Sequence, residues 1–333
     1  RIGSPAIFAV SGQYWNSMMD IAAEVHRAAA RIYDVVRETP LDLLVGFSDE
    51  QCKVYGKLEN FQHTGSFKLR GAVNKLMSLD ESQRQAGCVT ASTGNHGAAM
   101  AYAFSKLGMK GMVFVPETAA KTKVESIRRY GGDLKFHGLD GAQTERYARE
   151  FAEANGMLYV SPYNDPQIIG GQGTVGLEMH RQRPNLDAVF VAVGGGGLMS
   201  GIAGFLKSVN PDIQIYGCQP ANSAVMAHSI EAGHVIDEES LPTLSDGTAG
   251  GMDLDSITFE PCRDFVDEWI LVDEEEIAVA MRKFMQSQHQ LLEGSAGVAL
   301  AGVDRMRDAL EGKRVATVIC GANISMDTLK QVL

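Results

Sequence analysis

The sequence predicts an α/β protein with two parallel-sheet domains and helices on both faces of each sheet. Short apolar strand patterns alternate with amphipathic helix patterns along most of the chain, which is typical of βαβ units. The alternation occurs in two series, separated near residues 162–166, so two sheets are expected. The 36 glycines fit this class, because strand-to-helix turns and backbone-lined ligand sites often need the conformational freedom of glycine.

The segment before the first series contains two helices and one short strand. An apolar stripe over residues 17–38 predicts a helix that ends before Thr39-Pro40. A strand is predicted at 54–58, and a second helix follows Lys68 and extends to about residue 79. Residues 1–11 begin without Met and without a clear signal-peptide pattern, so we exclude them from the fold prediction.

The two series give most of the predicted elements. The first has strands at 88–91, 112–115, 134–136 and 157–160, and helices at 95–107, 121–130 and 143–154. Gly131-Gly132 is expected to end the helix at 121–130 with a left-handed residue. The second series has strands at 188–193, 213–218, 269–272 and 315–320, and helices at 169–181, 198–209, 224–231, 274–288 and 296–310.

Composition excludes several classes of partner. The net charge of −11 argues against nucleic acid or an anionic membrane as the main partner. No apolar run approaches the ~18 residues of a transmembrane helix. The five cysteines are odd in number and form no Cys-x-x-Cys pair, so we expect free thiols in a reducing compartment and a cytoplasmic protein.

Lys68 is the first chemically informative residue. Most lysines in such a position are solvated and structural. However, a lysine at a helix N-terminus is held where the helix dipole and desolvation both favour the neutral amine. A neutral amine can attack an aldehyde and form a Schiff base, so Lys68 is a candidate nucleophile.

Two further turns join a strand to a helix. Gly194-Gly195-Gly196-Gly197 can bring backbone amides together on an anion, and the alternative is a flexible turn. The four glycines fit neither a nucleotide P-loop nor a Rossmann fingerprint. In Ser92-Thr93-Gly94-Asn95-His96, Ser92 or Thr93 can cap the following helix, and Asn95 presents an amide.

Four motifs in this order resemble the fold type II (tryptophan-synthase-like) pyridoxal-phosphate enzymes, in particular the serine/threonine dehydratase and serine racemase branch. They are Thr64-Gly65-Ser66-Phe67-Lys68-Leu69-Arg70-Gly71, Ser92-Thr93-Gly94-Asn95-His96-Gly97, Gly194-Gly195-Gly196-Gly197-Leu198 and Cys320-Gly321-Ala322-Asn323-Ile324-Ser325. The resemblance covers roughly residues 40–330. It implies a large cofactor-binding domain (1–83 and 165–333), a small domain (84–164), pyridoxal 5'-phosphate in the cleft between them, and a homodimer.

The resemblance also implies a role for each site residue. Lys68 is the catalytic residue and carries the cofactor as a Schiff base, Asn95 binds its ring hydroxyl, and Cys320 lies against the pyridine nitrogen. The full cofactor-binding set implied is Phe67, Lys68, Asn95, Gly194, Gly195, Gly196, Gly197, Leu198 and Cys320. The implied substrate-binding set is Ser92, Thr93, Gly94, Asn95, His96 and Glu293.

Two departures from the family pattern narrow the function. Racemase-like members have a serine where this chain has Thr93, and a bulkier, stiffer side chain there disfavours racemisation. Metal-activated members have carboxylates where this chain has Gln219 and Val225. Because a hard cation prefers charged oxygen ligands, no metal is expected at that place.

We therefore predict that the protein is a dehydratase, or ammonia-lyase. It is expected to convert a small L-β-hydroxy amino acid of the threonine or serine type to a 2-oxo acid and ammonia. A 3-hydroxyaspartate or phenylserine dehydratase, a racemase, a β-replacement synthase and a non-catalytic ligand-binding protein stay open as alternatives. Loops near Tyr163, residues 245–251 and Glu293 are expected to contact the β-substituent of the substrate and so to determine which amino acid is accepted. Since the chain ends ten residues after Asn323, we expect no feedback-regulatory domain after it.

Overall fold

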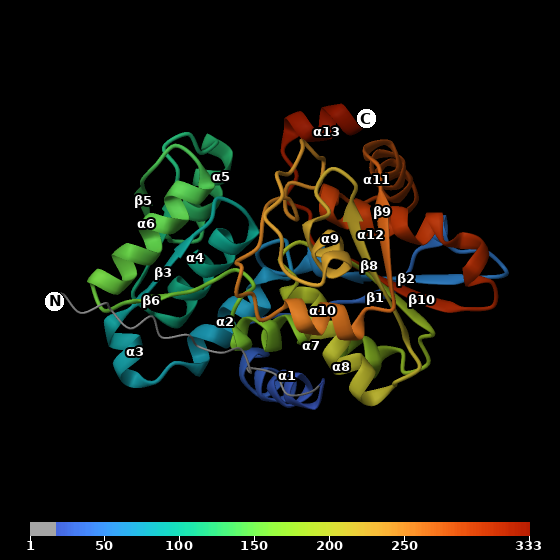
Figure 1. Ribbon diagram of the computed structural model, residues 1–333, viewed down its shortest axis with the longest axis horizontal. Coiled ribbons are helices and arrows are strands. Elements are labelled where there is room, and N and C mark those ends of the chain that lie inside the picture. Colours follow the sequence, from blue (N-terminus) through green and yellow to red (C-terminus); the bar gives the residue numbers. More distant parts are fainter. Residues whose placement is uncertain (1–17) are drawn as a thin grey trace.

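The computed structural model describes residues 18–333 and contains two β-sheets that lie side by side with helices around and between them (Figure 1). The predicted α/β class is therefore confirmed. Residues 1–11, and residue 17 at the start of the first predicted helix, lie outside the described residues. Among the described residues, no helix combines the length and apolarity needed to cross a bilayer.

The larger sheet has six strands in the order β1-β2-β10-β7-β8-β9. Its strands are β1 (Leu41–Leu43), β2 (Lys53–Leu58), β7 (Ala188–Ala192), β8 (Gln214–Pro220), β9 (Glu268–Val272) and β10 (Arg314–Ile319). Neighbouring strands are parallel except for the edge strand β1, which pairs antiparallel with β2. The central strand β7 is buried along its whole length, as expected for a parallel sheet covered on both faces.

The smaller sheet has four parallel strands in the order β5-β4-β3-β6. They are β3 (Cys88–Ala91), β4 (Gly111–Val115), β5 (Asp133–Phe136) and β6 (Leu158–Tyr159). All four strands lie inside the segment 84–164. The division of the chain into domains at residues 84 and 164 stays a prediction.

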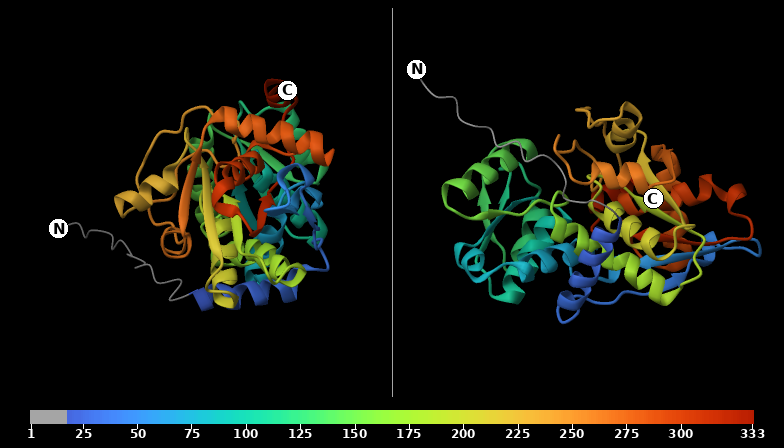
Figure 2. Two further views of the ribbon diagram at one scale, coloured as in Figure 1. Left: turned by 90° about the vertical axis from the view of Figure 1, so that its right-hand side faces the viewer. Right: turned by 60° about the horizontal axis from the view of Figure 1, so that its bottom comes forward.

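Helices cover both faces of each sheet. In the larger sheet, α1 (Met18–Ile32), α7 (Pro166–Gln182) and α8 (Gly197–Val209) lie on one face, and α11 (Glu274–Gln288) and α12 (Gly294–Arg305) lie on the other (Figures 1 and 2). In the smaller sheet, α4 (Asn95–Leu107) and α5 (Lys121–Arg129) lie opposite α6 (Gly141–Ala154). The helix α2 (Lys68–Ser78) packs against both α7 and α4, so it lies between the two sheets.

The remaining helices are short. They are α3 (Glu81–Ala86), α9 (Val225–Ala232), α10 (Phe259–Phe265), α13 (Met326–Val332) and the 3-10 helices η1 (Val45–Phe47), η2 (Glu59–Phe61) and η3 (Arg307–Leu310). Two predicted helices are shorter in the structure: the first ends at Ile32, and the last long one ends at Arg305 and is followed by η3. The Gly131 cap forms as predicted, with a φ of 85°.

Glycines allow α7 and α8 to pack closely on one another. A Cβ atom added to Gly201 in α8 would lie 2.5 Å from the carbonyl oxygen of Ile169 and 2.6 Å from the backbone nitrogen of Gly173 in α7. These are backbone atoms, so the neighbours cannot give way by rotating a side chain. The separation of the two helices therefore requires glycine at this position.

We expect Gly201→Ala to lower the free energy of unfolding by about 1–3 kcal/mol, because the two helices must move apart to accept the methyl group. Gly141→Ala is the matched control, because no atom lies within 4 Å of its added Cβ and it begins the helix α6. Its effect should stay within about 0.5 kcal/mol. Urea unfolding measures both; equal effects of the two changes would contradict the close-packing argument.

Candidate active site

The candidate site is organised by the turn that precedes α2. The backbone N–H of Phe67 donates to the carbonyl oxygen of Cys320 at 3.0 Å. The backbone N–H of Ala322 donates to the carbonyl oxygen of Gly65, also at 3.0 Å. Gly65 has a φ of 72°, a left-handed conformation that favours glycine. The end of β10 therefore fixes the turn, and with it the first residue of α2, Lys68.

The Lys68 amine lies in a poorly solvated place. Its Nζ donates a hydrogen bond to the carbonyl oxygen of Pro162 at 2.9 Å. Desolvation lowers the pKa of Lys68 to about 8, while the nearby Cys320 and Glu293 act in the opposite direction. The helix N-terminus was expected to act in the same direction, but burial is the main cause of the lowered pKa. Near neutral pH, a useful fraction of this amine is unprotonated and nucleophilic.

Glu293 connects the two sheets across the site. Its carboxylate accepts hydrogen bonds from Asn95 Nδ2 at 2.9 and 3.0 Å and from the backbone N–H of Asn323 at 3.2 Å. Asn323 Nδ2 in turn donates to Asn95 Oδ1 at 2.6 Å. Because Asn95 begins α4 beside the smaller sheet and Glu293 precedes α12 beside the larger one, one carboxylate joins the two halves of the site.

The thiol of Cys320 lies against the same carboxylate, with its Sγ 3.8 Å from Glu293 Oε1. Burial raises the pKa of Glu293 and, together with the neighbouring carboxylate, raises the pKa of Cys320 well above its ordinary value. Cys320 is therefore a neutral thiol at physiological pH. The structure places this neutral group at the carboxyl end of β10, close to Lys68.

The four-glycine loop follows β7 and leads into α8. Gly196 is the N-cap residue, with a φ of 83°, and no side chain among the described residues caps α8. A Cβ on Gly195 would lie 2.6 Å from the ring of Tyr163, and one on Gly197 would lie 3.0 Å from the same residue. Tyr163 directly follows Pro162, the partner of Lys68, so the loop lies near the lysine. Its uncapped helix N-terminus suits a phosphate group.

The loop 92–96 follows β3 and leads into α4. The expected capping by Ser92 or Thr93 is wrong, because the N-cap residue is Gly94 and no side chain makes a capping hydrogen bond there. Ser92 Oγ instead accepts from the N–H of Gly94 at 3.2 Å. A Cβ on Gly94 would meet no atom within 4 Å, so open space adjoins the loop. The start of α4 is thus accessible to a small anion such as a carboxylate.

His96 lies inside the protein rather than at the surface of the loop. Its Nε2 is 3.3 Å from the carbonyl oxygen of Val160, and desolvation together with Lys68 lowers its pKa to about 3. The imidazole is therefore neutral, and the Val160 contact makes Nε2 the protonated nitrogen. Nδ1 has no partner among the described residues. Nδ1 is thus a free acceptor, while Nε2 is occupied by the Val160 carbonyl.

Gln219, and Asn164 next to Tyr163, have structural partners. The Gln219 side chain donates to the carbonyl oxygen of Val193 and accepts from the N–H of Ala227, so its amide is occupied. Asn164 bonds Asp253 and the N–H of Ile257. Within residues 18–333, no group of three or more His, Cys, Asp or Glu side chains is arranged to hold a metal ion.

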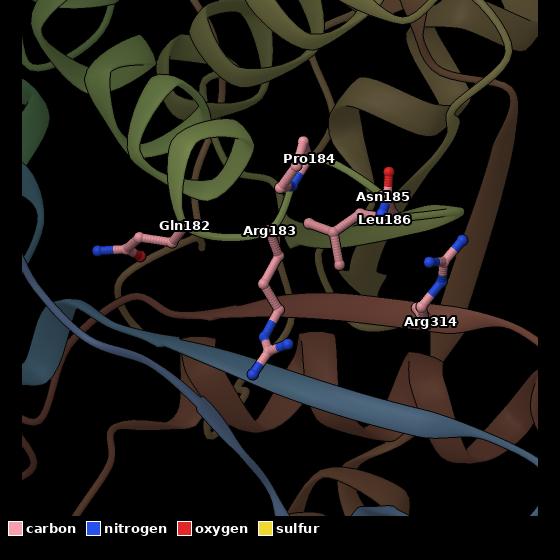
Figure 3. A pocket seen from close by; sticks show the side chains of 6 residues that line it. All are labelled: Gln182, Arg183, Pro184, Asn185, Leu186 and Arg314. Atoms are coloured by element: carbon pink, nitrogen blue, oxygen red, sulfur yellow. The ribbon is translucent and has the colours of Figure 1, made fainter.

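The pocket shown in Figure 3 is separate from this site. It has a volume of about 150 Å³ and is lined by Gln182, Arg183, Pro184, Asn185, Leu186 and Arg314. These residues precede β7 or begin β10, so the pocket lies at the amino ends of parallel strands. Ligands of open α/β sheets bind at the carboxyl ends, where Lys68, the glycine loop and Cys320 are found.

Sequence reasoning missed Asn323 and Pro162 as site residues. Asn323 was inside a recognised motif, but only the fold shows that it contacts Asn95 and Glu293. Pro162 contributes through its carbonyl oxygen, which no residue pattern could have indicated.

The donor set fits pyridoxal phosphate. The uncapped start of α8 suits its phosphate, a lysine with a lowered pKa suits its aldehyde, and the amide of Asn95 and the neutral thiol of Cys320 offer polar partners for its ring. These four groups, the start of α8, Lys68, Asn95 and Cys320, follow the carboxyl ends of strands from both sheets.

Comparisons with known proteins agree with this chemistry. A family model described as "Pyridoxal-phosphate dependent enzyme" matches residues 32–321. The catabolic L-threonine dehydratase TdcB of Escherichia coli strain K12 is 35% identical over 317 residues, covering 94% of each chain. The processed form of threonine deaminase isoform 2 from Solanum lycopersicum matches with a TM-score of 0.89 and 32% identity, covering 96% of this chain and 93% of that one.

Maize serine racemase matches nearly as well, with a TM-score of 0.87 and 33% identity over 93% of this chain and 95% of that one. The chain spans only 62% and 51% of the length of two other curated threonine dehydratases that it matches. The matches therefore cover nearly all of this chain, whereas some of the relatives are considerably longer than the part that matches.

We expect Lys68 in the cofactor-free protein to react with a small aldehyde with a half-maximal rate at a pH of about 8, because desolvation lowers its pKa. Borohydride trapping followed by peptide mass spectrometry measures this rate at each pH. Lys68→Ala identifies the modified peptide. A midpoint near the ordinary lysine value of about 10.4 would contradict the desolvation argument.

Proposed function

The chain belongs to the family of pyridoxal-phosphate dependent enzymes, and on this premise we propose that it is an ammonia-lyase. Its proposed substrate is a small L-β-hydroxy amino acid of the threonine or serine type, and its products are a 2-oxo acid and ammonia. The observation that carries the proposal is the desolvated Lys68 amine, fixed between the end of β10 and the Pro162 carbonyl. The likeness to threonine dehydratases over most of the chain supports the substrate type.

Each part of the site has a place in holding the cofactor and the substrate. The amides of the 194–197 loop and Leu198 would hold the cofactor phosphate, Asn95 and Cys320 would contact its ring, Phe67 would line the pocket, and Lys68 would bond it covalently. When bound, pyridoxal phosphate supplies an electron sink that makes loss of the substrate Cα proton possible. The segment 92–96, which contains the uncapped start of α4, would bind the substrate carboxylate, with Glu293 beside it.

Lys68 is the group that moves the Cα proton. Its amine is the group placed to accept that proton, because desolvation lowers its pKa to about 8, a value that suits a base near neutral pH. The neutral thiol of Cys320 does not hold a ring nitrogen protonated as a carboxylate would. With this neutral group beside its ring nitrogen, the cofactor would supply a milder electron sink, which supports elimination of the β-hydroxyl.

A racemase is the second candidate, because the match to maize serine racemase is almost as good as that to threonine deaminase. Racemisation requires a proton to be returned on the face opposite Lys68. Thr93 occupies the place of the second serine of racemase-like members, and its stiff β-branched side chain makes this return less efficient. A β-replacement synthase and a non-catalytic binding protein have no comparable observation in their favour.

The setting of the enzyme is also part of the proposal. We propose a cytoplasmic homodimer; the buried free thiols support a reducing compartment, and the family resemblance supports the dimer. The absence of a metal at Gln219 and Val225 stays a prediction. It is supported by the hydrogen bonds that already occupy the Gln219 amide.

We expect the purified protein, yellow from pyridoxal phosphate bound to Lys68, to release ammonia and a 2-oxo acid from L-threonine or L-serine. Lys68→Ala should lower kcat at least about 10³-fold, because it removes the proposed base and the covalent attachment point. Lys330→Ala, a change of an exposed lysine on α13, is the control and should leave kcat unchanged. A coupled assay should include L-threo-3-hydroxyaspartate and L-threo-phenylserine. A yellow protein that releases no oxo acid from any of the four would refute the ammonia-lyase proposal.

We expect Thr93→Ser to raise the ratio of racemisation to elimination on L-serine, because a smaller hydroxyl side chain can return a proton more freely. Chiral chromatography of the remaining serine, together with oxo-acid release, measures the ratio. An unchanged ratio would show that Thr93 is not the residue that disfavours racemisation.

A further inference from the structure

A cluster of charged side chains is buried beneath α2, outside the residues assigned to cofactor or substrate. It consists of Lys57, Glu59, Arg70 and Glu178 together with Thr39, and we call it the α2 anchor. All five residues are at most 1% exposed. They come from β2, η2, α2, α7 and the segment after α1, so the cluster joins parts of the chain far apart in sequence.

Arg70 is the centre of the α2 anchor. Its guanidinium bonds the Glu59 carboxylate twice, at 2.8 and 2.8 Å, and the Glu178 carboxylate twice, at 2.5 and 2.9 Å. Thr174 Oγ1 accepts a further hydrogen bond from Arg70 Nη1 at 3.1 Å. Two bidentate contacts fix the plane of a guanidinium as well as its position.

Further contacts surround the two carboxylates that bind Arg70, and one of them adds a second positive charge. Lys57 Nζ lies 2.6 Å from Glu178 Oε2, and Tyr33 Oη donates to Glu178 Oε1 at 2.9 Å. Thr39 Oγ1 donates to Glu59 Oε1 at 2.5 Å. Two cations and two anions thus neutralise one another in the interior. Apolar side chains of the same size are often as stable as a buried ion pair, so stability alone is a weak reason for such a cluster.

The geometry of α2 links the anchor to Lys68. Two residues along an α-helix correspond to a rotation of about 200°, so Lys68 and Arg70 project from nearly opposite faces. The backbone of α2 also lies directly on α7. A Cβ on Gly71 would be 2.4 Å from Gln172 Nε2, and one on Gly171 would be 2.6 Å from the carbonyl oxygen of Arg70. Because one face of α2 is held this closely, the helix has little freedom to rotate, and the direction of the side chains on its other face is fixed.

We propose that Arg70 is a positioning residue for Lys68. The α2 anchor sets the rotation of α2 about its axis and thereby aims the Lys68 amine at the place where it reacts. The proposal rests on the cofactor-linked lysine of the proposed function, but it does not depend on which amino acid is the substrate. It assigns to Arg70 an effect on reactivity that goes beyond its contribution to folding.

Arg70→Lys in the holoenzyme is the principal test. A lysine keeps the positive charge but cannot make two bidentate contacts, so α2 can rotate. We expect kcat to fall about 10-fold to 100-fold with little change in KM, as for a misplaced catalytic group. We also expect hydroxylamine to displace Lys68 from the cofactor at least about 10-fold faster, followed as loss of the visible absorption band without substrate.

Tyr33→Phe and Thr174→Val form a matched pair of milder variants. Each removes one hydroxyl contact from the α2 anchor, but only Thr174 touches Arg70. Thr174→Val should change the hydroxylamine rate and kcat in the same direction as Arg70→Lys, whereas Tyr33→Phe should leave both unchanged. Thermal unfolding of each variant reports its stability separately. If Arg70→Lys does not fold, this pair decides the question.

The outcomes separate the two proposals. Variants that lose thermal stability but keep the wild-type hydroxylamine rate and kcat would overturn the positioning role. So would equal changes of those two quantities in Tyr33→Phe and Thr174→Val. If no substrate is turned over by the wild-type protein, the ammonia-lyase proposal fails, but the hydroxylamine rates still test Arg70.

Discussion

Desolvation of the Lys68 amine is the interaction on which the candidate site depends. An amine in water would be protonated and unreactive, and here the removal of water lowers its pKa to about 8. That desolvation exists because three separate pieces of chain meet at Lys68. The end of β10 fixes the turn before it, the segment after β6 supplies the Pro162 carbonyl, and α2 carries the lysine between the two sheets.

Burial has opposite consequences in two neighbouring parts of the molecule. In the candidate site it suppresses charge, because it lowers the pKa of Lys68 and His96 and raises that of Glu293 and Cys320. In the α2 anchor the side chains are as deeply buried but directly paired, and the contacts with Glu59 and Glu178 raise the pKa of Arg70 despite its burial. Pairing does not always prevail, since desolvation lowers the pKa of Lys57 although this lysine contacts Glu178.

The sequence predicted those elements whose ends carry a clear local signal. The strand at 88–91 and the helix at 95–107 match β3 and α4, because an apolar run stops at a polar, glycine-containing turn. The edge strand β1 was missed because its three residues, Leu-Asp-Leu, are too few to establish an alternating pattern. The helix α3 was also missed although Asp80 and Gln83 form a capping box, since all its residues are solvent-facing or nearly so and leave no apolar stripe.

Prediction of the site had a similar limit. Lys68, the glycine loop and Cys320 lie in local motifs and could be recognised. The contacts that give them their properties join residues far apart in sequence, such as Asn95 with Glu293 and Arg70 with Glu178. No spacing rule reports such pairs. Glu293 was therefore placed in the substrate-binding set without its bonds to Asn95, and the α2 anchor was not predicted.

The two halves of the site are held with unequal strength. Lys68 is on a helix fixed by fully buried, bidentate charge pairs, and removing one partner from such a pair is strongly destabilising. The smaller sheet is tied to the 246–253 segment by the ion pairs Lys123–Asp246 and Arg149–Asp253, whose side chains are 25–65% exposed. Pairs of this kind contribute about 0–1 kcal/mol.

A further tie across the site is formed by Asn95, which bonds both Glu293 and Asn323, in addition to the packing of α4 on α2. A ligand that bonds Asn95 competes with this carboxylate and weakens the tie. The lysine therefore forms the fixed half of the site. On the other half, the hydrogen bonds of Asn95 are the contacts that a bound ligand would replace.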